Sequence, residues 1–82
     1  MDIGRFDEPV NVLFGKPGQI RVVSSAREAG ECLTSARWPI KSNRKHLAVR
    51  RAISAVMEGK QPSKSARKAF HALAKDVDIL VE

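Results

Sequence analysis

Residues 10–28 read VNVLFGKPGQIRVVSSARE, and this stretch decides the fold of the chain. Alternate residues from Val10 to Phe14 would share one face of a strand, because side chains along a strand repeat with a period of two. Pro17-Gly18 suits a tight turn, since proline presets φ and glycine accepts a positive φ. Residues 20–23 are again rich in β-branched side chains. The stretch therefore predicts a β-hairpin with strands at 10–14 and 20–23.

The end of the same stretch predicts the start of a helix. Ser25 and Glu28 have the S-x-x-E spacing of a capping box, in which a hydroxyl and a carboxylate satisfy unpaired backbone N–H groups. Small apolar residues then recur three and four apart and predict a narrow buried face. They are Ala26, Ala29, Gly30, Leu33 and Ala36. Trp38-Pro39 should end this helix, because the residue before proline disfavours the α conformation.

Two further helices and a final strand are predicted in the second half of the chain. One helix should run from Asn43 to Glu58 and end at Gly59. Its buried stripe is expected to be Val49, Ala52, Ile53, Val56 and Met57. The next should open at Pro62-Ser63, with Ala66, Ala69, Phe70, Leu73 and Ala74 inside and Lys64, Lys68, His71 and Lys75 outside. Alternating apolar residues from Val77 to Val81 predict a third strand.

This order of elements predicts a single α+β domain over residues 1–82. We expect a β-hairpin, three helices and a short C-terminal strand, in which a small antiparallel or mixed sheet carries the helices on one face. Residues 1–8 are expected to be irregular. The side chains expected to face the helices are Val12, Ile20, Val22 and Ile79. The open face would then expose Leu13, Val23 and Leu80.

Several motifs of the chain resemble one protein family. They are Phe6-x-x-Pro9-Val10, Glu28-Ala29 ahead of Leu33, Trp38-Pro39, Ala48 and Ala52 ahead of Glu58-Gly59, and Ala66-Arg67-x-Ala69-Phe70 ahead of Ile79. Together they resemble a family of short bacterial proteins, found mainly in rhizobia, that is known as domain of unknown function 982. The resemblance covers nearly the whole chain. It implies a small cytoplasmic protein without a known activity, so it supplies no functional residues.

The residues that could support catalysis or metal binding are few. Cys32, His46 and His71 belong to three different predicted helices and lack the C-x-x-C or H-x-x-x-H spacing of metal sites. Gly15 and Gly18 are better explained by a hairpin turn than by a phosphate loop. We therefore expect no enzyme, no catalytic residue, no metal, no cofactor and no small-molecule substrate. Trp38 is interpreted as the plug of a small core, with an exposed binding anchor as the alternative.

The cellular compartment is predicted from what the chain lacks. Cys32 is the single cysteine and cannot form an internal disulfide, which favours a reducing, cytoplasmic compartment. The N-terminus does not resemble a signal peptide. No stretch approaches the roughly 20 apolar residues that cross a bilayer, so a membrane association is not expected.

Charge is the strongest functional signal in the sequence. Between Arg37 and Lys75 eleven Lys or Arg accompany one acid, Glu58, whereas the two ends together carry a net charge of −4. A positive field of this kind attracts polyanions such as nucleic acid. The candidate polyanion contacts are Arg44, Arg50, Arg51, Lys64, Lys68 and Lys75. The outer face of the last helix lacks Asn and Gln, which favours phosphate contacts over reading of bases.

Two alternatives to this hypothesis stay open. The basic residues can serve solubility alone. A homodimer or a protein-interaction module is the second hypothesis, because Leu13, Val23 and Leu80 on the open sheet face would form an apolar surface next to an exposed strand edge. The dimer would have twice the mass of the 9.0 kDa chain.

Overall fold

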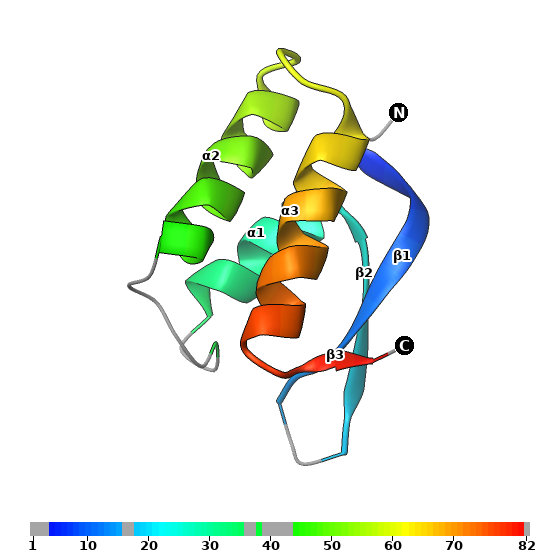
Figure 1. The fold of residues 1–82 in the computed structure, drawn as a ribbon. Coiled ribbons are helices and arrows are strands. Elements are labelled where there is room, and N and C mark those ends of the chain that lie inside the picture. Colours follow the sequence, from blue (N-terminus) through cyan, green and yellow to red (C-terminus); the bar gives the residue numbers. More distant parts are fainter. Residues whose placement is uncertain (1–3, 16–17, 36–37, 39–43, 82) are drawn as a thin grey trace.

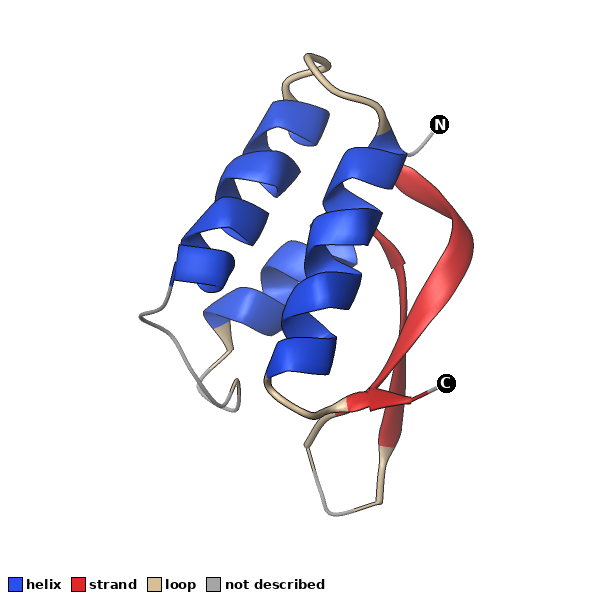
Figure 2. Ribbon diagram, in the orientation of Figure 1, coloured by secondary structure: helices blue, strands red, loops and turns tan. Residues whose placement is uncertain are grey.

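The computed structural model describes residues 4–15, 18–35, 38 and 44–81 of the 82-residue chain. Its elements are β1 (Arg5–Leu13), β2 (Ile20–Ser25), α1 (Ala26–Thr34), α2 (Arg44–Met57), α3 (Ser63–Asp76) and β3 (Leu80–Val81). The three strands form one antiparallel sheet in the order β2-β1-β3. The helices lie together on one side of this sheet (Figure 1). The predicted α+β architecture is confirmed, and Figure 2 shows its two layers by colour.

The first strand is longer than the sequence indicates. β1 begins at Arg5, so the expectation of an irregular segment over residues 1–8 is wrong for residues 5–8. The pairing with β2 shifts register between Arg5, opposite Ser25, and Val10, opposite Val23. Pro9 lies within this irregular part and has no N–H to donate to a ladder. The irregularity interrupts the strict alternation by which a strand is recognised in a sequence.

The register of the hairpin corrects the predicted faces of the sheet. Val12 lies opposite Arg21 and Val10 opposite Val23, so Val23 faces the helices and is fully buried. Ile20 and Val22, which were expected to face the helices, are both 52% exposed on the open face. A shift of one residue exchanges the two faces of a strand, and residues 20–23 carry apolar side chains on both faces. Apolar alternation alone therefore does not determine the register.

The side-chain orientation and the length of the last strand also differ from the prediction. Leu80 lies opposite Val12 and packs against the core, so it belongs to the helix side rather than to the open face. Val77 caps α3 and Asp78 adopts a φ of 62°, which breaks the alternation assumed from Val77 onward. β3 is consequently confined to Leu80–Val81.

The predicted helices are confirmed, with small differences at their ends. Ser25 caps α1 by accepting the N–H of Glu28 at 3.2 Å, as the capping box requires. The second half of the capping box differs from the prediction. The Glu28 carboxylate accepts the N–H and the hydroxyl of Ser24 instead of the N–H of Ser25. On α2 the expected burial of Met57 is wrong, since this side chain is 45% exposed while His46 is buried. Ala36, Pro17 and Pro39 lie outside the described residues.

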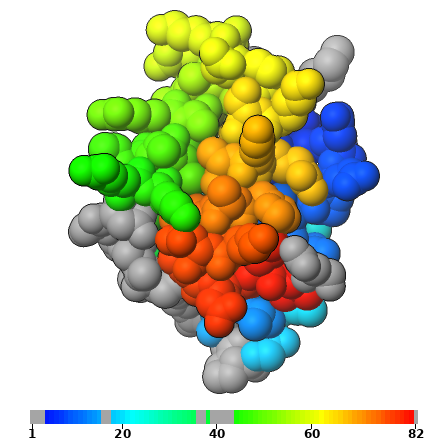
Figure 3. Space-filling model, in the orientation of Figure 1, coloured from blue at the N-terminus to red at the C-terminus, as the bar shows by residue number. Residues whose placement is uncertain are grey.

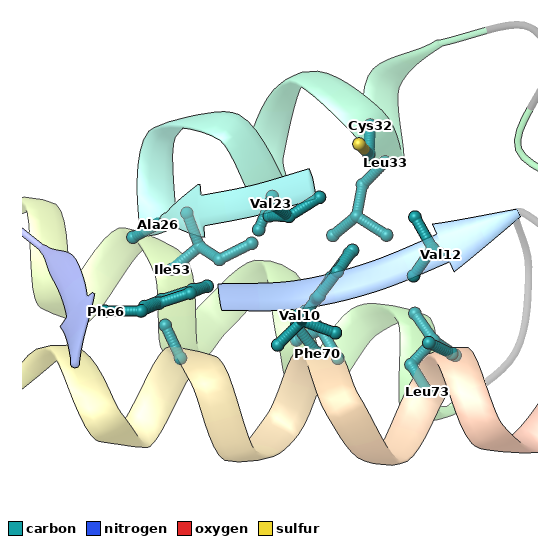
Figure 4. Packing of buried hydrophobic residues seen from close by; sticks show 14 of the residues in the cluster. Phe6, Val10, Val12, Val23, Ala26, Cys32, Leu33, Ile53, Phe70 and Leu73 are labelled. Atoms are coloured by element: carbon teal, nitrogen blue, oxygen red, sulfur yellow. The ribbon is translucent and has the colours of Figure 1, made fainter. Parts of the chain in front are cut away.

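The core lies between the sheet and the helices. Side chains of β1, β2, α1, α2 and α3 meet there, and Figure 4 shows Val10 and Phe70 among them. Trp38 is 3% exposed and packs between two other aromatic rings, with centroid distances of 6.3 Å to Phe14 and 5.7 Å to Phe70. The interpretation of Trp38 as a core plug is confirmed, and it does not serve as an exposed anchor.

Candidate nucleic-acid interface

α2 and α3 form an antiparallel pair on the outside of the molecule. Nζ of Lys45, in the first turn of α2, lies 2.8 Å from Oδ1 of Asp76 at the end of α3. Both helices are visible side by side on one face of the space-filling view, α2 in green and α3 in yellow to orange (Figure 3). Because their buried residues face the core, their polar faces are left to solvent.

The six predicted polyanion contacts all lie on the exposed sides of these two helices. We call them the basic surface: Arg44, Arg50, Arg51, Lys64, Lys68 and Lys75. Within the described part of the chain, none of the six makes an ion pair or a side-chain hydrogen bond. Neighbouring cations on the same helices and their connection do have acidic partners. Lys45 pairs with Asp76, and Lys60 lies 3.1 Å from Glu58.

The structure divides the basic surface into two parts. On α3, Lys64 and Lys68 line a shallow hollow of about 580 Å³ together with Ser65, Arg67 and His71. On α2, Arg50 and Arg51 line a second hollow of about 420 Å³. Arg44 and Lys75 lie at the end where the Lys45–Asp76 ion pair joins the helices. The six cations thus extend over two neighbouring helices and do not converge on one point, as an extended polyanion requires.

The positions of several cations are unfavourable for helix stability. Arg44 and Lys45 lie in the first turn of α2, Lys64 lies in the first turn of α3, and neither first turn contains an acid. The N-terminus of a helix carries partial positive charge, so a cation there costs roughly 0.3–1 kcal/mol when exposed. Stability of the fold therefore does not explain this charge distribution.

Arg67 has a structural role that the sequence did not reveal. Its Nε donates to the backbone carbonyl of Glu8 at 2.7 Å, and its guanidinium lies 3.9 Å from the Glu8 carboxylate. The contact ties α3 to the irregular part of β1. An arginine one residue after Ala66 on an otherwise basic helix gives no signal of this tether, because the tether depends on the register shift of β1.

No aromatic side chain is available on the basic surface. The chain has three Phe, one Trp and no Tyr. Phe6, Trp38 and Phe70 are buried, and Phe14 is half-buried against the core. Stacking on unpaired bases needs an exposed ring. The protein therefore lacks the platform with which single-strand binders hold bases.

The remaining candidate residues do not form a reactive site. Cys32 is fully buried, and burial raises the pKa of its thiol. Among the described residues, no three His, Cys, Asp or Glu side chains gather closely enough to hold a metal ion, so Cys32, His46 and His71 are not brought together as a metal site. None of the described helices is both long enough and apolar enough to cross a membrane.

The predicted interface residues are only partly brought together. Leu13 lies on the open sheet face and is 43% exposed, whereas Val23 and Leu80 face the helices. The register instead places Ile20 and Val22 beside Leu13. The apolar strip on the open face therefore combines Leu13, as predicted, with Ile20 and Val22, which the sequence analysis assigned to the helix side of the sheet.

The fold and its surface define a small α+β protein with a basic helical face. The model of the family described as "Protein of unknown function (DUF982)" matches residues 8–81, so the chain belongs to that family. No curated protein and no solved structure matches the chain. The motif residues Trp38, Arg67 and Phe70 pack the core or tie α3 to β1.

Proposed function

We propose that this protein is not an enzyme and binds the phosphate backbone of double-stranded nucleic acid through the basic surface. The observation that carries the proposal is that none of the six cations has an ion-pair partner among the described residues, although nearby cations on α2 and in the connection to α3 are paired. Phosphate groups would supply the missing negative charges. Binding would be strengthened by the release of counterions from the nucleic acid.

The chemistry of the surface favours a duplex and contacts without sequence preference. The outer face of α3 offers Lys64, Lys68 and Lys75 with His71, and these side chains suit phosphate contacts. The aromatic rings that would stack on single-stranded bases are in the core or half-buried against it. Asn and Gln, which read adenine in the major groove, are lacking on this face. The lone cysteine, Cys32, is buried and supports the further proposal of a cytoplasmic location.

Fluorescence anisotropy of a short labelled duplex tests the proposal. We expect saturable binding with a dissociation constant of about 10⁻⁶–10⁻⁴ M near physiological salt, as for other non-specific complexes. If the three lysines of α3 each contact one phosphate, the logarithm of the affinity should fall with the logarithm of salt concentration with a slope of about −2.7. A single strand of the same length should bind more weakly. The label must be on the nucleic acid, because the fluorescence of buried Trp38 reports the core.

A pair of variants separates a specific surface from net charge. Lys64→Glu with Lys68→Glu should weaken duplex binding by more than tenfold and lower the salt slope by about 2. Arg5→Glu with Arg27→Glu is the matched control, since both residues are exposed and both double variants change the formal charge from +6 to +2. Equal loss in the two variants would show that only net charge matters. No binding by the wild type at low salt would contradict the proposal and indicate that the basic surface serves solubility alone.

A further inference from the structure

β2 is an edge strand, and the outward backbone groups of Ile20 and Val22 are unpaired within the described residues. The N–H of Phe14 donates to the Gln19 carbonyl at 3.1 Å, while the N–H of Leu13 points the other way and donates to the Ile79 carbonyl at 2.7 Å. Bonded and non-bonded pairs alternate along an antiparallel ladder. Leu13–Ile20 and Asn11–Val22 are therefore non-bonded pairs. Ile20 and Val22 consequently direct their N–H and C=O groups away from β1.

The same two residues expose apolar side chains. Ile20 and Val22 are each 52% exposed on the open sheet face, next to Leu13. An exposed apolar edge is a template for pairing with another strand, and soluble proteins usually blunt it with a charge, a proline or a bulge. Among the described residues, the one side chain that caps a backbone group of this edge is Glu28, whose carboxylate accepts the N–H of Ser24 at 3.3 Å. No described residue pairs with the edge over Ile20–Val22.

We infer that this edge pairs with the β2 edge of a second copy of the chain, in an antiparallel arrangement centred on Val22. The two three-stranded sheets would then form one sheet of six strands. Two backbone hydrogen bonds would join Val22 to Val22 of the second copy. On each side the Ile20 N–H would donate to the Ser24 carbonyl of the second copy, and Glu28 would keep its bond to the Ser24 N–H.

Symmetry and side chains select this register. A two-fold axis makes the same residues meet from both copies, so the centre must be a residue or a residue pair of β2 itself. A centre at Arg21 would place two arginines directly opposite each other, and like charges in that position destabilise a sheet. A centre at Val22 instead pairs two apolar side chains on the open face and places Arg21 opposite Val23 of the second copy.

The charges around the edge favour a second copy as the occupant. Arg21 lies 3.4 Å from Glu31, and Arg27 lies 3.6 Å from the same carboxylate. With Glu28, these residues give two positive and two negative charges near β2. Elsewhere the formal charge of +6 would make two copies repel each other, above all at the basic surface. The β2 edge is a locally neutral region through which identical chains can approach.

Light scattering over a wide range of concentration tests for the dimer. We expect the mass to rise towards twice 9.0 kDa, and Val22→Lys to raise the dissociation constant at least about tenfold because two lysines would meet at the axis. Val22→Pro removes an outward N–H and should act likewise. Leu13→Lys is the matched control, since Leu13 lies on the same face but on the central strand. Circular dichroism verifies that each variant is folded.

Disulfide trapping tests the register separately. Residues at the centre of a bonded antiparallel pair have Cα atoms about 5.5 Å apart, which a disulfide can bridge. In a Cys32→Ser background, Val22→Cys should cross-link rapidly on mild oxidation and Ile20→Cys should not. A monomer at every concentration would overturn the inference. A dimer that survives both Val22 variants, or that Leu13→Lys disrupts equally, would overturn pairing through the edge.

Discussion

Replacing Gly4 with alanine should destabilise the protein strongly, although this residue precedes the first strand. Gly4 has a φ of 89°, and an L-residue in a left-handed conformation costs about 1–2 kcal/mol. An added Cβ would lie 2.9 Å from Cγ1 of Val56 and 3.0 Å from Cβ of Ala26. The Gly4 carbonyl also accepts the Ala26 N–H at 2.9 Å, so the backbone is held in place at the start of α1. Overpacking adds about 1–3 kcal/mol, so we expect a total loss of about 2–5 kcal/mol in the free energy of unfolding.

Two other glycines serve as controls for this prediction. Gly59→Ala also places alanine at a positive φ, but nothing lies within 4 Å of its Cβ, so only about 1–2 kcal/mol should be lost. Gly30→Ala should stabilise α1 by up to about 1 kcal/mol, because its Cβ meets Ile53 at an ordinary 3.7 Å. Urea unfolding followed by Trp38 fluorescence measures all three. Equal losses for Gly4→Ala and Gly59→Ala would refute the packing of Gly4 against α1 and α2.

Two further predictions concern titratable groups of α1. The hydrogen bond from the Ser24 hydroxyl lowers the pKa of Glu28 below its ordinary 4.5, so this carboxylate stabilises the fold above pH 4.5 and ceases to do so as pH falls through its lower folded-state pKa. Glu28→Gln should therefore lower the free energy of unfolding by about 1 kcal/mol at pH 7 and leave it unchanged in strong acid. Thermal unfolding of both proteins across pH measures this difference, and parallel pH profiles would contradict the prediction. Burial raises the pKa of the Cys32 thiol. In the folded protein this thiol should therefore react with Ellman's reagent far more slowly than in urea-unfolded protein. Equal rates would show that α1 opens readily.

Local signals in the sequence predicted the order of the elements and the buried faces of the helices, but not the lengths of β1 and β3 or the faces of β2 and β3. The helix cap at Ser25 and the apolar periodicity of α2 and α3 depend on residues within a few positions of each other. These predictions hold except for the partner of the Glu28 carboxylate and the burial of Met57. The register of β2 depends instead on the geometry of the loop between Leu13 and Ile20. With apolar residues at 20, 22 and 23, both registers bury a hydrophobic side chain, so the pattern does not discriminate between them.

The candidate site likewise combines features that local sequence patterns predict with features that depend on tertiary packing. The six members of the basic surface were identified from composition and helical spacing, and all six are exposed. Their arrangement in two parts follows from how α2 packs on α3, which no local pattern encodes. The tether from Arg67 to the Glu8 carbonyl and the exposed pair Ile20 and Val22 were missed for a similar reason, since both depend on the pairing of β1 with β2.

Residues of the family motifs stabilise the fold, whereas cations of the basic surface lower its stability, and one variant tests this difference. Trp38 and Phe70 stabilise the core, whereas Lys64 makes no ion pair with any described residue and lies near the positive end of α3. Lys64→Glu would place an acid in that first turn, four residues before Lys68 and within reach of its ammonium group. We expect a gain of about 0.5–1.5 kcal/mol in the free energy of unfolding. The same change should weaken duplex binding. A stabilised variant with undiminished binding would show that this lysine has no part in the interface, whereas stability gained as binding is lost is the trade-off expected of a functional residue.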